Sequence, residues 1–185
     1  GALVQFLPDI IPAASSGSMN NVLFGGFKPE DKKEAWVHYE TLAGGCGACA
    51  TSPGASALHS HMTNTLNTPI GEMERLFPLL MPSYRIREAV LSGDIHPGGS
   101  GVERRYQFLA PTTLTLMTER RLLSPYPLAG GTPGLRGRNR LLRRDGTLEE
   151  LPGKIIYQAS PGDTLIIETP CGGGWGSVWV LGWDG

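Results

Sequence analysis

The residues best suited to chemistry lie in one polar stretch that contains two histidines. His59 and His61 flank Ser60, so in an extended segment both imidazoles lie on one face, about 7 Å apart. That spacing suits chelation of one metal ion. The other two histidines, at positions 38 and 96, are scattered, and no nearby carboxylate pair completes a site. We therefore favour hydrogen-bonding roles for His59 and His61 over metal ligation, and we predict no metal site in this chain.

The same stretch continues with two asparagines and three threonines. Asn64 and Asn67 lie between the histidines and Pro69, and amides and hydroxyls presented together can hold a polar ligand or a neighbouring backbone. Thr68 has a plainer explanation, because it precedes a proline at the start of a predicted helix and fits the N-cap position. The cap leaves the two histidines and two asparagines unexplained, and they become candidates for ligand contacts.

Cys46 and Cys49 have the spacing of a redox dithiol. Such a motif needs a helix start to stabilise a thiolate, and the Thr-Ser-Pro-Gly sequence at 51–54 opposes a helix there. A zinc site would need two further ligands, which Cys171 and His59 or His61 could supply. We favour a tight loop of small residues over both alternatives.

Other motifs that could bind anions or nucleotides are weak. Gly45-x-Gly47-x-x-Ala50 follows a predicted strand, but no amphipathic helix follows it. A phosphate loop ending in Gly-Lys-Ser or Gly-Lys-Thr and a serine-nucleophile elbow are both absent from the sequence, so we expect any ATP to be bound on another chain. The glycines at 172–176 suit an anion nest or, more plainly, a tight turn. The five arginines between 136 and 144 suit a phosphate-binding patch, a solvated hairpin or a subunit contact. We favour the hairpin or the subunit contact over phosphate binding.

Composition limits the class of protein. A length of 185 residues with 40% apolar and 18% charged residues fits one globular domain over 1–185. The net charge of −1 and the lack of an apolar run of about 18 residues argue against nucleic-acid and membrane partners. Three cysteines fit a reducing compartment, and we expect a cytoplasmic protein.

Hydrophobic periodicity predicts a mainly β, α+β protein with one or two short helices. The 26 glycines and 15 prolines favour short strands joined by turns over crossover helices, so the sheet is expected to be antiparallel, as a sandwich or barrel-like. Residues 1–7 resemble the end of a helix whose beginning is absent, residues 8–21 a polar loop, residues 57–67 an extended segment, and residues 69–77 an amphipathic helix. Strands are predicted at 35–42, 84–91, 102–109, 112–117, 139–143, 154–158 and 164–168.

Three segments, in this order, resemble the hydantoinase B/oxoprolinase family. They are Tyr-Glu-Thr-Leu-Ala-Gly-Gly at 39–45, His-Ser-His-Met-Thr-Asn-Thr-Leu-Asn-Thr-Pro at 59–69, and Thr-Pro-Cys-Gly-Gly-Gly-Trp-Gly at 169–176. Residues 12–21, 128–131 and 137–139 also resemble family segments, so the likeness covers nearly the whole chain. It implies the C-terminal portion of a B-type subunit that is part of a larger enzyme and not active alone.

The resemblance also implies a function. The chain is expected to help open 5-oxoproline, hydantoin or a related lactam, together with a hydantoinase A-type subunit that binds ATP and with an N-terminal portion that carries any divalent metal. The alternatives are a subunit of an ATP-dependent acetone- or acetophenone-type carboxylase and a non-catalytic assembly module. On this basis we predict catalytic roles for Glu40, His59 and His61, and contacts with the small-molecule substrate from Asn20, Asn21, Asn64 and Asn67.

Overall fold

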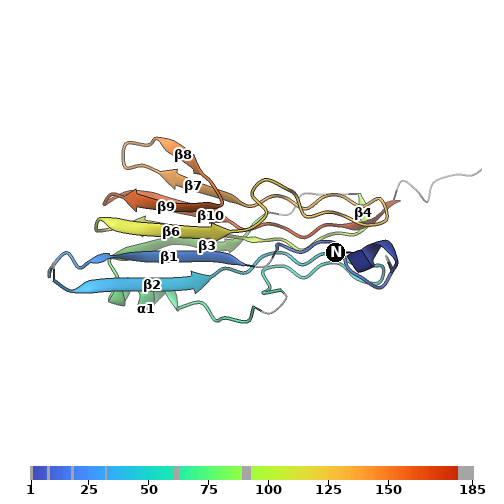
Figure 1. Cartoon of the computed structure of the whole chain (residues 1–185), viewed down its shortest axis with the longest axis horizontal. Helices are drawn as coiled ribbons and strands as arrows, with labels where there is room; N and C mark the ends of the chain where they lie inside the picture. Colours follow the sequence, from blue (N-terminus) through green and yellow to red (C-terminus); the bar gives the residue numbers. More distant parts are fainter. Residues whose placement is uncertain are drawn as a thin grey trace, which may run out of the picture.

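Two antiparallel sheets packed face to face form the body of the molecule (Figure 1). The computed structural model describes residues 2–7, 9–17, 19–31, 33–60, 63–88 and 93–178. The first sheet has the order β2 (Ala35–Thr41), β1 (Asn20–Phe27), β6 (Thr112–Thr118), β9 (Lys154–Ala159). The second has the order β3 (Leu79–Ile86), β5 (Val102–Phe108), β10 (Thr164–Glu168), β7 (Arg138–Leu142), β8 (Leu148–Leu151).

Alternating apolar residues create the core between the sheets. In β6 the side chains of Leu114 and Leu116 are buried while the intervening threonine at 115 is not, as period-two alternation requires. Phe24 of β1 lies opposite Leu114 in the register. Its ring makes edge-on contacts with Tyr106 and Phe108 of the second sheet, at centroid distances of 4.8 and 5.5 Å. These aromatic contacts join the two sheets.

Glycine-rich segments extend from the sandwich and run side by side without forming regular strands (Figure 1). The Gly172 amide donates to the Gly99 carbonyl at 2.8 Å, and the Gly99 amide donates to the Cys46 carbonyl at 2.9 Å. A Cβ added to Gly172 would lie 1.8 Å from the Cys46 carbonyl oxygen. The backbones therefore pack at distances that only glycine permits, which accounts for much of the high glycine content.

The remaining elements are short. Helix α1 (Ile70–Leu76) buries Met73 against the core, a 3-10 helix spans Ala2–Gln5, and β4 (Asp94–His96) pairs with β11 (Trp175–Ser177). In the ranges that the structure describes, no helix combines the length and apolar character needed to cross a membrane.

The predicted antiparallel sandwich is confirmed, and its sheets do not close into a barrel. The predicted helix at 69–77 corresponds to α1, and most predicted strands match observed ones within two residues at each end. Two predicted bounds were wrong. The polar loop at 8–21 ends earlier, because β1 begins at Asn20, and β3 begins at Leu79 instead of 84, because Leu79 and Met81 supply core side chains. The strands β1, β4, β8 and β11 were not predicted.

Candidate functional site

A buried cluster of charged side chains joins the two sheets at Glu40, one of the predicted catalytic residues. Glu40 comes from β2, while Arg104 and Tyr106 come from β5 of the other sheet. Glu40 Oε2 lies 3.3 Å from Arg104 Nη1, and the Tyr106 hydroxyl donates a short hydrogen bond to Glu40 Oε1. The side chains of Glu40 and Arg104 are only 3% and 0% exposed. Glu40 therefore lies inside the sandwich, in an ion pair between its layers.

The surroundings favour the charged form of Glu40. Burial alone would raise the pKa of this carboxyl, but the neighbouring His38 imidazole, the Arg104 charge and the Tyr106 hydroxyl together hold the pKa below its ordinary value of 4.5. His38 Nε2 lies 3.6 Å from Glu40 Oε1. Burial and the Glu40 charge raise the pKa of Tyr106 well above 10. At neutral pH the cluster thus contains a carboxylate and a protonated phenol.

Arg104 is held chiefly by aromatic rings and by the Glu40 carboxylate. Its guanidinium carbon lies 4.5 Å from the centroid of the Tyr84 ring and 5.3 Å from that of Tyr106, which are cation–π distances. None of its three nitrogens has a hydrogen bond of good geometry within the described part of the chain. The buried positive charge of Arg104 therefore depends on Glu40 for compensation.

Asn67 ties the polar segment to this cluster. Its amide nitrogen donates to Glu40 Oε2 at 3.1 Å and to the Thr41 carbonyl at 3.0 Å. Its amide oxygen accepts a hydrogen bond of 2.9 Å from the Tyr84 hydroxyl. Three hydrogen bonds thus fix one point of the segment that precedes α1, and the buried carboxylate accepts one of them.

Residues 64–66 of the polar segment are exposed. Asn64 is exposed, and Leu66 is 99% exposed. His59 is half-buried, and the hydroxyl of the adjacent Ser60 donates to the Gly17 carbonyl at 3.4 Å. His61 lies outside the described residues. The segment is therefore held near Ser60 and at Asn67, with a surface-exposed portion between them.

Asn20 and Asn21 lie on opposite faces of β1. The Asn21 amide oxygen accepts a 2.8 Å hydrogen bond from the Thr41 hydroxyl, next to Glu40. Asn20 is buried, and its amide oxygen accepts a 2.6 Å hydrogen bond from Arg121. The structure therefore brings Glu40 and Asn67 together. Asn21 pairs with Thr41 on the opposite face of the sheet from Glu40, and Asn20 lies at a separate site.

Sequence reasoning missed Arg104, Tyr106 and Arg121. A signal for the first two was present, since Val102, Arg104, Tyr106 and Phe108 alternate along one strand and all face the core. That alternation assigns an arginine to the interior, where it requires a carboxylate. Glu40, 64 positions earlier, is that carboxylate, and no local pattern pairs two residues so far apart.

We predict that Asn67→Ala lowers the free energy of unfolding by about 1–3 kcal/mol, because three hydrogen bonds are lost and one acceptor is a buried carboxylate. Asn64→Ala, an exposed matched control, should change it by less than about 0.5 kcal/mol. Urea unfolding followed by circular dichroism measures both. Similar losses for the two variants would show that the Asn67 hydrogen bonds do not hold the segment.

The cysteines form no metal centre in the part of the chain that the structure describes, which contains no group of three metal-ligating side chains. Cys46, Cys49 and Cys171 are free thiols. Cys171 is buried, and its sulfur accepts the Gly101 amide at 3.5 Å. Hydrogen bonds from the side chains of Ser52 and Thr51 lower the pKa of Cys49 to about 7, whereas burial raises the pKa of Cys46.

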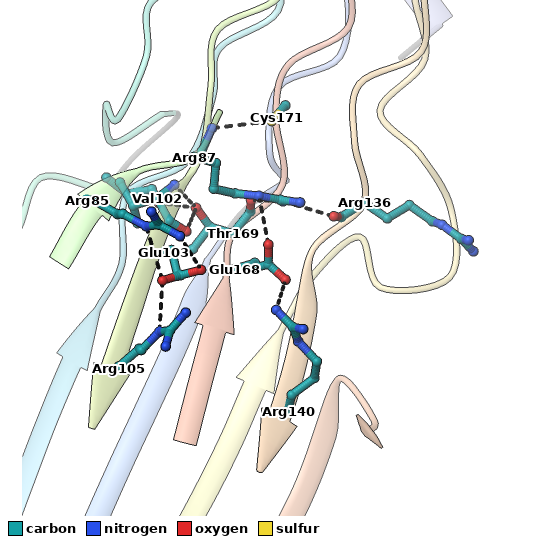
Figure 2. Close-up of polar contacts among 12 residues, drawn as sticks. Arg85, Arg87, Val102, Glu103, Arg105, Arg136, Arg140, Glu168, Thr169 and Cys171 are labelled. Carbon is teal, nitrogen blue, oxygen red and sulfur yellow. Dashed lines mark hydrogen bonds and ion pairs between the residues drawn. The ribbon is translucent and has the colours of Figure 1, made fainter. Parts of the chain in front are cut away.

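Two glutamates of the second sheet each bind two arginines, one of which belongs to the basic run (Figure 2). Glu103 contacts Arg85 and Arg105, at 3.2 and 2.9 Å. Glu168 contacts Arg140 at 2.6 Å and Arg87 at 3.5 Å. The hairpin of β7 and β8 thus contains part of the run, and Arg140 contributes to the stability of the sheet.

Comparison with known proteins agrees with this architecture. The hydantoinase B/oxoprolinase family matches residues 1–178. The chain is 39% identical to 5-oxoprolinase 1 of Arabidopsis thaliana, covering 89% of this chain and 12% of that protein. It is 38% identical to 5-oxoprolinase of Saccharomyces cerevisiae, covering 90% and 14%.

Solved structures show the same fold. The ATP-dependent caprolactamase from Pseudomonas jessenii superposes with a TM-score of 0.68 at 22% identity, covering 95% of this chain and 31% of that one. Nucleotide-free acetone carboxylase gives a TM-score of 0.67 at 18% identity, covering 92% and 27%. The chain thus spans less than a third of each of these relatives. On the match over residues 1–178, it belongs to the hydantoinase B/oxoprolinase family.

Proposed function

We propose that this chain is a component of an ATP-dependent enzyme that opens a cyclic amide such as 5-oxoproline or hydantoin. Identity of 38–39% to two proteins named 5-oxoprolinase carries the proposal. The fold shared with an ATP-dependent caprolactamase, whose name also denotes a lactam substrate, supports it. ATP would be bound by a hydantoinase A-type partner.

In this proposal the sandwich is a rigid support for the polar segment. The exposed Asn64 and the nearby His59 would contact the lactam in a cleft completed by the remaining part of the enzyme. His61 is assigned the same role from its place in the sequence. Glu40 would act by positioning, since its carboxylate is enclosed and binds Asn67. Rigid support of binding groups is what an active site requires of its surroundings.

The outer face of the first sheet supports association with other portions of such an enzyme. Val37 and Tyr39 of β2 and Ile156 of β9 are 65%, 55% and 72% exposed. Leu23 and Met117, on the strands between them, add to the same face. Contiguous exposed apolar side chains mark protein–protein contacts. The hydantoinase A-type subunit and the N-terminal portion of the B-type subunit are the partners that we propose.

The proposal is tested by reconstituting the chain with the subunits that co-purify with it. We expect ATP hydrolysis that depends on 5-oxoproline or hydantoin, with release of the ring-opened product. ATP-dependent incorporation of bicarbonate into acetone or acetophenone, with no turnover of lactams, would instead identify the complex as a carboxylase, for which the fold of acetone carboxylase is the supporting observation.

A variant of His59 distinguishes a catalytic role of this chain from a role in assembly alone. His59→Ala should lower turnover about 10²-fold or more if the imidazole takes part in proton transfer, while size-exclusion chromatography shows an intact complex. Loss of assembly with unchanged activity per remaining complex would support the assembly module. His96→Ala is the matched control, because this histidine lies on β4, away from the polar segment in the chain.

A further inference from the structure

A half-buried arginine that forms no ion pair lies just after β6. The Arg121 guanidinium donates to Asn20 Oδ1 at 2.6 Å, to Asn139 Oδ1 at 2.7 Å and to the Glu119 carbonyl at 2.6 Å. Asn139 is itself fixed by hydrogen bonds to the Thr118 hydroxyl and the Pro152 carbonyl. All three acceptors of Arg121 are neutral. Among the described residues, no carboxylate lies within the 4.0 Å that defines an ion pair with it.

Arg121 lines two surface concavities at once. The larger, of about 740 Å³, also contains Arg120 and Lys154, with Glu119 as its acidic side chain. The smaller, of about 370 Å³, also contains Arg136 and Arg138, with Glu150 as its acidic side chain. Each concavity therefore has three cationic side chains, Arg121 included, and one carboxylate, which leaves an excess of positive charge on both sides of the Arg121 guanidinium.

Partial burial makes this charge costly. Desolvation, together with repulsion from Arg87, lowers the pKa of Arg121 to about 9, so the group still carries its charge at neutral pH. The Glu119 and Glu168 carboxylates act in the opposite direction, but neither forms an ion pair with Arg121 among the described residues, so the partly desolvated charge is only partly compensated. An anion placed beside the guanidinium would relieve that cost. Four of the five guanidinium N–H groups bind Asn20, Asn139 and the Glu119 carbonyl, so the fifth and the neighbouring cationic side chains would hold the anion.

We infer that Arg121 forms a binding site for the oxyanion of a small organic molecule, a carboxylate or a phosphate. Leu122 and Leu123, which line the larger concavity and are 85% and 73% exposed, offer apolar contacts to the rest of the ligand. Gly17 lines the same concavity, and its carbonyl accepts the Ser60 hydroxyl. The site therefore borders the polar segment beside His59, but the inference goes beyond the proposed function and stands on the charge and geometry of Arg121.

Isothermal titration calorimetry on the full chain tests this inference with three probes: inorganic phosphate, 5-oxoproline, and 2-pyrrolidinone, which has the same ring without the carboxylate. We expect phosphate or 5-oxoproline to bind, and 2-pyrrolidinone to bind at least about tenfold more weakly. Binding of phosphate alone identifies a phosphate site, and binding of 5-oxoproline alone a carboxylate site. Arg121→Gln should lower the affinity for the anion about tenfold or more. Arg75→Gln, which removes an exposed arginine of α1, should leave the affinity unchanged.

A second variant keeps the test valid if Arg121→Gln does not fold. Arg138 and Lys154 are exposed rim residues, one on each concavity. The double variant Arg138→Gln/Lys154→Gln should lower the affinity for the anion several-fold and reduce the salt dependence of binding. The inference is overturned if the native chain binds neither anion, or if both sets of variants bind as the native chain does. Phosphate binding is independent of lactam chemistry, so an enzyme inactive on lactams leaves this result standing.

Discussion

Glu40→Gln is expected to lower the free energy of unfolding by about 3–5 kcal/mol, because it leaves a fully buried arginine charge without its partner. The amide keeps the size of the side chain and can still bond to Asn67 and Tyr106. The charge that compensates Arg104 is lost, and no other carboxylate in the described residues lies within 4.0 Å of that guanidinium. Guanidinium unfolding at neutral pH measures the difference.

Glu34→Gln is the matched control for the loss of one carboxylate. Glu34 forms an exposed ion pair with Lys28 at 2.5 Å, and exposed pairs of this kind contribute at most about 1 kcal/mol. Equal changes for the two variants would contradict the view that the buried pair joins the sheets. Arg104→Met combined with Glu40→Gln should recover part of the loss, because the uncompensated charge is then absent.

The pH dependence of stability gives the same prediction a second measurement. The pKa of Glu40 is lower in the folded protein than its ordinary value of 4.5, so its contribution is fully present above about 4.5 and is lost as the pH falls through the folded value. The native chain should therefore lose stability below about pH 4.5 more steeply than Glu40→Gln, which has no carboxyl to titrate at this position. Identical acid limbs would show that Glu40 does not contribute.

The sequence predicts the strands better than it predicts which face of each strand is inside. Residues 35–41 alternate, but the alternation is ambiguous, because each face carries apolar and polar side chains. The structure buries Trp36, His38 and Glu40 and exposes Val37 and Tyr39. The polar pair is inside because its partners on β5 are inside, and a local pattern contains no information about that pairing.

The sequence predicted which segment contains the candidate site, but not which of its side chains contact the rest of the protein. The density of His, Asn and Thr at 59–69 identified the segment, and the structure shows that Asn67 anchors it while Asn64 is exposed. The two asparagines are three positions apart and have the same chemistry, so the sequence could not distinguish an anchor from a free group. Arg121 had no signal at all, since its distinguishing feature is the absence of a carboxylate among neighbours that come from β1 and β7.

Gly172→Ala is expected to lower the free energy of unfolding by more than about 3 kcal/mol, because the glycine-rich segments leave no space for a methyl group. The new Cβ would lie 1.8 Å from the Cys46 carbonyl oxygen and 2.7 Å from the Gly47 nitrogen. Both are backbone atoms, so a side-chain rotation cannot relieve the contact and two segments would have to separate. Gly172 is not among the glycines with positive φ, so steric overlap alone would cause the loss.

Gly71→Ala, the same chemical change at another position, is expected to raise the free energy of unfolding. Gly71 lies in α1, and a Cβ there would meet nothing within 4 Å, so alanine should stabilise the protein by about 0.5–1 kcal/mol through its higher helix propensity. Thermal and denaturant unfolding of the two variants beside the native chain measure both effects. A Gly172→Ala variant as stable as the native chain would mean that the segments can separate at little cost, and the contact of Gly172 with Cys46 would then not explain why glycine is needed there.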